Sequence, residues 1–552
     1  MRRTSLTISL AVILSVSAAA QSAGNVGQWE PFEISMTAHA RFANPYVDAL
    51  PDNGKPYVQV TFRGTGGEAN GQSYTVAGFW DGGQTWKARF APPAPGGWSY
   101  SVSSADPGLD GVKGSFQSIT WSVEEKVRNP ARHGFVRVAS QGPRAGRYFE
   151  YADGTPFLWI GDTWWNWTRK GIAFEHFKQL VDDRSAKGFS VGQMFLPGEG
   201  GFVDPKTELP DLDRLHDVEK MIAYANAKGI TVWIHAVWGG KGDREIAENG
   251  KLVRWWRYVV DRLAAYNVVW VLAGEYNMDD YSGVGLPFWR KLGQAVHAED
   301  PYGHVVGAHP TPPGWDGGKD APQWSTADAI HDEKWLDFNQ SQVGHGKWRN
   351  EMIPSVVASA YAKRPPKPIV VTEPWYEFVP GAAPAEDVRF GAWSAMLSGA
   401  AGHTYGGGRI WWAEAPGVAN EQGPWPLEGT FEESLHYAGA ESISFMGQFL
   451  RKTDWWNLEP HPELLSDTPS KFCSAVPGRE YVVLLRWGGM VDVDLRPSAK
   501  TDRFSCTWID LTTERSVFTG AVDGGAVREF HAPEDFPGSL KAKDWVLFLR
   551  KE

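Results

Sequence analysis

The feature that most constrains the fold is an alternation of short apolar runs with longer amphipathic stretches between residues 156 and 405. Short apolar runs predict buried strands, and stretches with helical spacing of apolar residues predict the helices between them. Eight such repeats, within the roughly 290 residues that end near position 450, fit a closed (β/α)8 barrel with a parallel sheet. The predicted strands are 157–160, 189–196, 230–237, 268–273, 305–308, 336–342, 369–372 and 402–405.

Two β-rich regions flank this barrel. Residues 25–125 contain short alternating runs separated by glycine-rich turns, which predict an N-terminal β-sandwich with strands at 32–37, 57–62, 73–79, 85–90 and 98–102. Residues 126–155 form a connector, the barrel takes residues 156–452, and residues 453–552 predict a C-terminal β-sandwich. We therefore expect a multidomain protein with a central TIM barrel between two β domains.

The N-terminus has the order of a secretory signal peptide. Arg2 and Arg3 precede an apolar run over residues 6–16, and small residues follow up to position 23. This run is shorter than the roughly 20 apolar residues that a membrane helix needs, and no second segment approaches that length. We expect residues 1–23 to be removed, and the mature protein to be periplasmic or extracellular without a membrane span.

Charge and cysteine content narrow the function classes further. The net charge of −11 repels phosphate backbones, so nucleic-acid binding is not expected and a neutral substrate fits best. The only two cysteines, Cys473 and Cys506, could form one disulfide in an oxidising compartment or remain as two buried thiols. They cannot complete a zinc site alone, and the sequence has neither a His-Glu-x-x-His motif nor a phosphate-binding glycine loop. We predict no metal and no cofactor.

Two glutamates follow predicted strands at the end of a barrel where active sites lie. Glu275 comes after the fourth strand and Glu373 after the seventh. Glycosidic cleavage needs one carboxyl group to protonate the leaving oxygen and a second to attack the anomeric carbon or activate water. The sequence therefore indicates a glycoside hydrolase with Glu275 and Glu373 as catalytic residues. Glu199, in a glycine-rich loop, is the rival acid/base.

Other residues near the strand ends are candidate substrate-binding groups. Aromatic rings stack on the C–H faces of sugars, and the chain has 29 tryptophans, although tryptophan also fills large cores. For each candidate the alternative is core packing or an ordinary rim position. The candidates are Asp162, Trp164, Trp165, His235, Trp238, Asn277, His309, Trp375, His403, Tyr405 and Trp411.

Several barrel segments resemble a known family. They are Gly161-Asp162-Thr163-Trp164-Trp165 at the first strand, Arg184 with Lys187-Gly188-Phe189 before the second, and residues 401–406 with Ile410-Trp411 around the eighth. With these, residues 156–412 resemble the apiosidase-like barrel hydrolases. The N-terminal region is similar to a domain often joined to such barrels, and the tail resembles a small β domain of the collagen-binding type.

The resemblance implies a retaining, clan A-like mechanism. In that arrangement the acid/base glutamate follows strand four and the nucleophile follows strand seven, which corresponds to Glu275 and Glu373 here. Many clan A enzymes have Asn directly before the acid/base, whereas this chain has Gly274 there and Asn277 two residues after the glutamate. The usual contact of that Asn with the sugar 2-hydroxyl is therefore not assigned by sequence.

Two other function classes remain open at this stage. One is a carbohydrate-binding protein whose barrel has lost activity, which the two strand-end glutamates argue against. The other is a peptidase or matrix-binding protein, prompted by the collagen-binding resemblance of the tail. The chain has no zinc motif and no convincing Ser-His-Asp signature, which argues against proteolysis.

Overall fold

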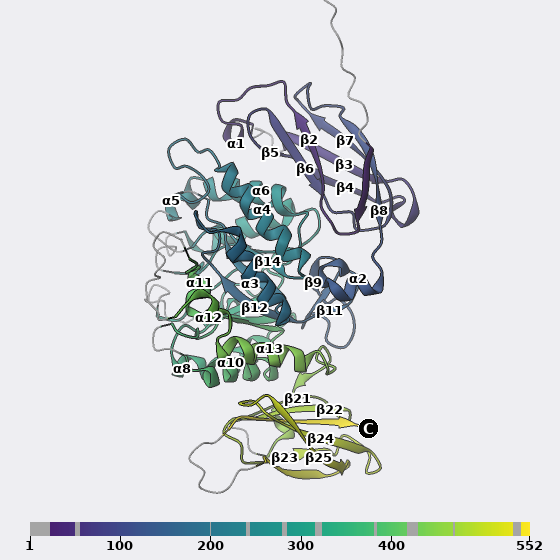
Figure 1. Ribbon diagram of the computed structural model, residues 1–552, viewed down its shortest axis with the longest axis vertical. Helices are drawn as coiled ribbons and strands as arrows, with labels where there is room; N and C mark the ends of the chain where they lie inside the picture. The colour runs from purple at the N-terminus through teal and green to yellow at the C-terminus, as the bar shows by residue number, and fades with distance from the viewer. Residues whose placement is uncertain are drawn as a thin grey trace, which may run out of the picture.

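The computed structural model describes residues 22–49, 56–198, 200–238, 243–278, 284–314, 323–379, 383–416, 429–466, 470–533 and 543–552. Within these residues the chain forms an N-terminal β domain, a central barrel and a C-terminal β domain, stacked along the long axis of the molecule (Figure 1). The predicted multidomain architecture is confirmed.

Eight parallel strands form the central sheet in the order β16-β15-β14-β13-β12-β19-β18-β17. β12 pairs in parallel with both β13 and β19, which joins the first strand of the barrel to the last. The strands are β12 (Trp159–Trp164), β13 (Val191–Phe195), β14 (Thr231–His235), β15 (Val268–Val271), β16 (Val306–Gly307), β17 (Asn339–Gln342), β18 (Ile369–Glu373) and β19 (Gly402–Tyr405).

The seam between β16 and β17 is bridged by Asp337. Its backbone N–H donates to the carbonyl of Val306 at 2.9 Å, and its carboxylate accepts from the backbone N–H of Val306 at 2.7 Å. In a fully paired sheet, the backbone groups of Val306 would form hydrogen bonds with the backbone of the neighbouring strand. Here Asp337 provides both partners. The ring of strands is thereby nearly closed.

Helices with one buried face surround the strands. In α3, for example, Phe177, Leu180, Val181 and Arg184 are buried while the remaining face is polar. The longer helices are α3 (Phe174–Ala186), α4 (Leu212–Ala227), α6 (Lys251–Leu263), α7 (Gly285–Glu299), α9 (Ile353–Ala362), α10 (Ala385–Leu397) and α13 (Ala438–Leu450). Shorter ones are α5 (Asp243–Glu248), α8 (Lys347–Asn350), α11 (Gly408–Trp412) and α12 (Phe431–Leu435).

The first barrel strand differs from its prediction over residues 157–160. β12 begins at Trp159 and continues to Trp164, while Pro156–Phe157 forms β11 and pairs with β10 (Phe149–Tyr151). The extension follows from pairing with β19, in which Gly161 faces Thr404 and Asp162 faces Tyr405. Asp162 therefore lies inside a strand rather than beyond its end.

The N-terminal domain consists of two sheets, with strand orders β1-β8-β7-β3-β4 and β2-β6-β5. The predicted strand 73–79 is divided at Gly78, where an added Cβ would lie 2.8 Å from the side chain of Val58. The strands are β1 (Ser22–Gly27), β2 (Phe32–Thr37), β3 (Val58–Gly64), β4 (Ser73–Ala77), β5 (Phe79–Trp80), β6 (Thr85–Phe90), β7 (Gly96–Ser104) and β8 (Lys113–Ile119).

Buried ion pairs join this domain to the barrel. Arg89 of β6 donates to both carboxylate oxygens of Glu219 on α4, at 2.6 and 3.0 Å. Arg262 of α6 contacts the same Glu219 and also Asp81, at 2.7 Å. Bidentate pairs of this kind constrain orientation strongly, so the N-terminal domain is seated at a defined place on α4 and α6.

The connector closes the end of the barrel opposite the strand C-termini. It includes α2 (Val123–Arg128), β9 (Val136–Val138) and β10. The ring of Phe149 lies 5.4 Å from that of Trp159 and 5.5 Å from that of Phe338. The connector thus adds its own aromatic side chains to the lower layer of the barrel core.

The C-terminal domain packs against α10 and α13 through apolar side chains. Val482, Leu484, Ile509 and Val546 share a buried cluster with residues of these two helices. The domain contains a six-stranded sheet, ordered β20-β21-β22-β27-β24-β25, and a β23-β26 pair. Its strands are β20 (Glu459–Pro460), β21 (Lys471–Val476), β22 (Glu480–Leu485), β23 (Met490–Asp494), β24 (Arg503–Asp510), β25 (Arg515–Asp523), β26 (Val527–His531) and β27 (Trp545–Lys551).

The disulfide that the sequence suggested is absent. Cys473 on β21 and Cys506 on β24 are both free and buried, and β22 and β27 lie between their strands in the sheet. Neighbouring strands are roughly 4.8 Å apart, so the two Cα atoms are well beyond the roughly 7 Å that a disulfide can span. The expectation of a bond between them is wrong, and the alternative of two buried thiols holds.

Helices long and apolar enough to cross a membrane do not occur in the part of the chain that the structure describes.

Candidate active site

A cavity of about 590 Å³ lies at the C-terminal ends of the barrel strands. This volume is in the usual range for small-molecule sites, and its position is where barrel enzymes have their active sites. Both predicted catalytic glutamates line it. The lining residues are Trp165, Asn166, Phe195, Trp238, Glu275, Met278, Pro312, Gln342, Gly344, His345, Arg349, Glu373, Tyr376, Trp411 and Trp412.

Glu275 is held by an unusual backbone conformation just beyond β15. Its φ of 53° lies in the left-handed region, which non-glycine residues seldom adopt. The backbone N–H of Met278 donates to the Glu275 carbonyl at 3.0 Å, and Gln342 donates through Nε2 to Oε1 of the carboxyl group at 2.9 Å. A strained residue with a fixed side chain at a cavity wall is typical of a functional position.

The preceding Gly274 explains the departure from the clan A pattern. A Cβ at this position would lie 2.2 Å from the indole ring of Trp238, so no side chain fits. Asn277 does not take over the role of the missing Asn, because it is buried and its Oδ1 accepts the backbone N–H of Thr311 at 2.9 Å. Neither residue presents an amide to the cavity.

Glu373, the last residue of β18, is contacted by two histidines. His309 Nε2 lies 3.0 Å from Oε2 of Glu373, and His345 Nε2 lies 3.4 Å from Oε1. His309 is itself held through Nδ1, which is 3.0 Å from the hydroxyl of Thr372. Both carboxylate oxygens thus face a ring nitrogen.

The two glutamates differ in their electrostatic surroundings. Burial, and then the negative charge of Glu373, raise the pKa of Glu275 well above its ordinary value. Burial alone would also raise the pKa of Glu373, but the hydrogen bonds from His309 and His345 hold it well below the ordinary value. These surroundings therefore favour the protonated form of Glu275 and the ionised form of Glu373 at neutral pH.

Three predicted tryptophans, Trp165, Trp238 and Trp411, line the cavity. His235 and His309 lie one layer beneath it, because both are fully buried yet their rings lie 5.0 and 5.9 Å from that of Trp165. Burial and the nearby His309 lower the pKa of His235 well below its ordinary value.

Asp162 and Trp164 are placed away from the cavity, contrary to the substrate-binding role predicted for them. The Asp162 carboxylate is fully buried, pairs with Arg184 at 2.7 Å and accepts the indole N–H of Trp164 at 2.9 Å. Since Arg184 also donates to the carbonyl of Leu435, this group ties β12 and α3 to the segment before α13. The physical reason is the longer β12, which buries residue 162.

Trp375, His403 and Tyr405 are also absent from the cavity wall. Trp375 and Tyr405 belong to the buried cluster between the barrel and α13, and the Tyr405 hydroxyl donates to Glu377 at 2.7 Å. His403 is buried on β19, and burial lowers its pKa to about 3. Side chains alternate across a strand, so residues close to a strand end face the helices as often as the barrel interior.

Several wall residues were not predicted. Gln342 ends the predicted sixth strand, so the strand-end rule could have identified it. His345 and Tyr376 lie in the loops after β17 and β18, where no periodic pattern indicates their direction. The remaining ones are Asn166, Phe195, Met278, Pro312, Gly344, Arg349 and Trp412.

Glu199, the rival acid/base, lies outside the described residues. Within the described ranges, no group of three or more His, Cys, Asp or Glu side chains is arranged to hold a metal ion.

Comparisons with solved structures agree with the barrel architecture. One similar structure is that of a protein from Bacteroides vulgatus ATCC 8482 that is provisionally named a glycoside hydrolase. It is 20% identical to this chain and has a TM-score of 0.68, and the match covers 96% of this chain and 100% of that protein. A glycoside hydrolase of family 5 from the same organism is 20% identical, with a TM-score of 0.65 over 76% of this chain and 94% of its own. At these identities the likeness concerns the fold. No curated protein matches the sequence.

Family models identify two parts of the chain. Residues 25–105 match a domain of unknown function, DUF5060, which lies in the N-terminal β domain. Residues 143–457, more than half of the chain, match the model of the apiosidase-like catalytic domain. The protein therefore belongs to the apiosidase-like family, its barrel is the catalytic domain, and it is a glycoside hydrolase.

Proposed function

We propose that the protein hydrolyses O-glycosidic bonds of an oligo- or polysaccharide by a retaining mechanism, with Glu275 as acid/base and Glu373 as nucleophile. The main supporting observation is that the two glutamates that line one cavity have pKa values displaced in opposite directions. Acid and nucleophile need different protonation states at the same pH, and opposite displacement supplies them.

In the first step, Glu275 donates its proton to the leaving oxygen while Glu373 attacks the anomeric carbon. The bond from that carbon to the leaving group breaks, and a glycosyl ester with Glu373 forms. In the second step Glu275, now ionised, removes a proton from water, which attacks the same carbon and releases Glu373. Two displacements at one carbon leave its configuration unchanged.

The hydrogen bonds around His309 favour its cationic form beside the proposed nucleophile. The Thr372 hydroxyl donates to the carbonyl of Ser341 at 3.2 Å, so its oxygen is free to accept from Nδ1–H of His309. Nε2–H of His309 then donates to Glu373, which requires protons on both ring nitrogens. A positive imidazolium favours the ionised carboxylate.

The hydrogen bonds around His345 favour its neutral form. Its Nδ1 accepts the backbone N–H of Tyr376 at 3.4 Å, which leaves the proton on Nε2, facing Glu373.

The test is a screen of the purified protein against plant and bacterial polysaccharides, with analysis of the products. The proton signals of the first-formed sugar identify the anomer before it equilibrates. Release of the same anomer as in the substrate supports retention, whereas release of the opposite anomer contradicts it. If the protein binds glycans but hydrolyses none of them, the result would instead favour a non-catalytic carbohydrate-binding protein.

We also propose that the protein is exported, on the basis of the arginines and the apolar run within residues 1–23. Sequencing the N-terminus of the protein from its native host, after separation of periplasm, medium and cytoplasm, tests this. Recovery of an uncleaved chain in the cytoplasm would contradict it.

A further inference from the structure

A second pocket lies where the N-terminal domain meets the barrel, away from the catalytic glutamates. Its cavity measures about 90 Å³ and is bounded by the N-terminal domain on one side and by α6 and the end of α7 on the other. We call it the junction pocket and define it by Tyr46, Tyr57, Trp86, Arg254, Asp261 and Glu299.

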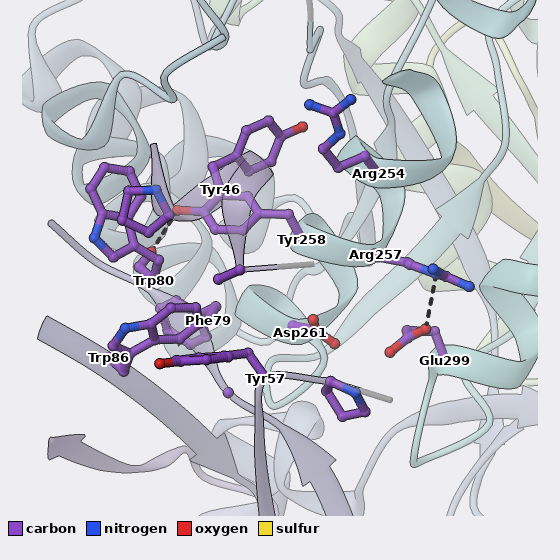
Figure 2. A pocket seen from close by; sticks show the side chains of 14 residues that line it. Tyr46, Tyr57, Phe79, Trp80, Trp86, Arg254, Arg257, Tyr258, Asp261 and Glu299 are labelled. Atoms are coloured by element: carbon purple, nitrogen blue, oxygen red, sulfur yellow. Dashed lines mark hydrogen bonds and ion pairs between the residues drawn. The ribbon is translucent and has the colours of Figure 1, made fainter. Parts of the chain in front are cut away.

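One side of the junction pocket is aromatic. Figure 2 shows the rings of Tyr46, Trp80, Trp86 and Phe79 gathered on that side, with the charged groups opposite them. The rings of Tyr57 and Trp86 are in contact, with centroids 4.9 Å apart. Such a surface matches the apolar C–H face of a sugar ring.

The opposite side supplies hydrogen-bonding groups. Asp261 is partly exposed and lines the pocket beside Glu299, and burial and the charge of Glu299 raise the pKa of Asp261 well above its ordinary value. Arg257 Nε lies 3.5 Å from Glu299, and the Arg257 side chain is exposed at the margin of the pocket. Carboxyl oxygens in this position can accept hydroxyl groups from a ligand that enters past Arg257.

The charges around the pocket balance. Arg254 pairs with Glu208 at 2.9 Å, and Arg257 pairs with Glu299. A strongly charged ligand would find no uncompensated partner among these groups. A neutral molecule with a flat apolar face and hydroxyl groups at its edge fits both sides of the pocket.

A small cavity lies beside both the junction pocket and the catalytic cavity. Tyr46 borders the junction pocket and a smaller cavity of about 30 Å³. That smaller cavity is bordered in turn by Phe195 and Trp238, which line the catalytic cavity. The smaller cavity therefore shares one bordering residue with the junction pocket and two with the catalytic cavity.

From the aromatic side, the hydrogen-bonding groups opposite it and the balanced charges, we propose that the junction pocket binds one neutral sugar residue. It is a second carbohydrate site, which both the N-terminal domain and the barrel build, and it is distinct from the catalytic cavity.

Hydrogen exchange followed by mass spectrometry tests the proposal on the full-length protein. The probes are the neutral methyl glycosides of glucose, galactose, mannose, xylose and arabinose, each titrated to saturation. We expect at least one of them to protect peptides from β3 and α6. Asp261→Asn removes a hydrogen-bond acceptor, and Tyr57→Ala removes an aromatic ring. Each variant should raise the half-saturating concentration of the protecting glycoside at least about fivefold.

The matched control is Asp217→Asn, which alters an exposed aspartate paired with Lys220 on α4. It should leave the titration unchanged. Protection of β18 peptides reports the catalytic cavity separately, so failure of the junction site is distinguishable from failure of the proposed catalytic function. The proposal is overturned if no probe protects the β3 and α6 peptides, or if both variants titrate like the wild type.

Discussion

The two walls of the catalytic cavity place the same kind of side chain in opposite surroundings. On the β15 side, Glu275 is buried and accepts one neutral amide hydrogen bond from Gln342. On the β18 side, Glu373 is equally buried but faces the ring nitrogens of His309 and His345. The difference shows that the partners of a buried carboxyl group, rather than burial itself, decide whether it acts as an acid or as an anion.

Removal of the proposed nucleophile should produce the largest effect. In Glu373→Gln we expect kcat to fall by at least about 10⁴-fold, because the variant lacks the carboxylate proposed to form the glycosyl intermediate. The measurement is steady-state hydrolysis of the polysaccharide found by screening. Glu432→Gln, an exposed position on α12, is the matched control and should be near wild type.

Removal of the proposed acid should give a loss of activity that depends on the leaving group. In Glu275→Gln we expect hydrolysis of a natural glycoside to fall by about 10²–10⁴-fold. A dinitrophenyl glycoside of the same sugar needs little protonation, so its first step should fall much less. Equal losses for both substrates would contradict the assignment of the acid to this wall.

Loss of a histidine partner should make the β18 wall resemble the β15 wall. Without His309, the pKa of Glu373 rises, and because activity needs the ionised form, the acidic limb of the kcat/KM profile moves to higher pH. In His309→Asn we expect a shift of about one pH unit, with a smaller shift in His345→Asn because that contact is longer. An acidic limb that stays in place in both variants would refute this role.

The smallest effect should come from removing the hydrogen bond that Glu275 accepts on the β15 side of the cavity. The hydrogen bond from Gln342 favours the ionised form of Glu275, so its loss in Gln342→Leu raises the pKa of Glu275 further. Because activity needs the protonated form, the basic limb should move to higher pH by a few tenths of a unit, with kcat on the plateau within about threefold of wild type. A shift to lower pH would show that Gln342 acts in another way.

Local sequence patterns predicted most elements of the fold. The strands at 32–37, 85–90 and 402–405 have the predicted bounds, since their alternation and flanking turns are local properties. The first barrel strand was misplaced because its C-terminal half is set by pairing with β19, about 240 residues later in the chain. Register with a distant strand does not appear in a local pattern.

The candidate site was predicted in part for the same reason. Glu275, Glu373, Trp165, Trp238 and Trp411 line the cavity, as expected from their positions near strand ends. Strand ends alone do not distinguish a residue that faces the cavity from one that faces the helices. Asp162, Trp375 and Tyr405 therefore entered the prediction although the structure buries them elsewhere.

By itself the sequence determined the order of strands and helices, the barrel architecture and the two glutamates at its mouth, because each depends on neighbours within a few residues. Only the tertiary structure revealed the surroundings that displace the pKa values of the two glutamates in opposite directions, the pairing of Asp162 with Arg184, and the two strands that separate the cysteines. Protonation and pairing depend on distances through space between groups far apart in the chain, and those distances exist only after the barrel has closed.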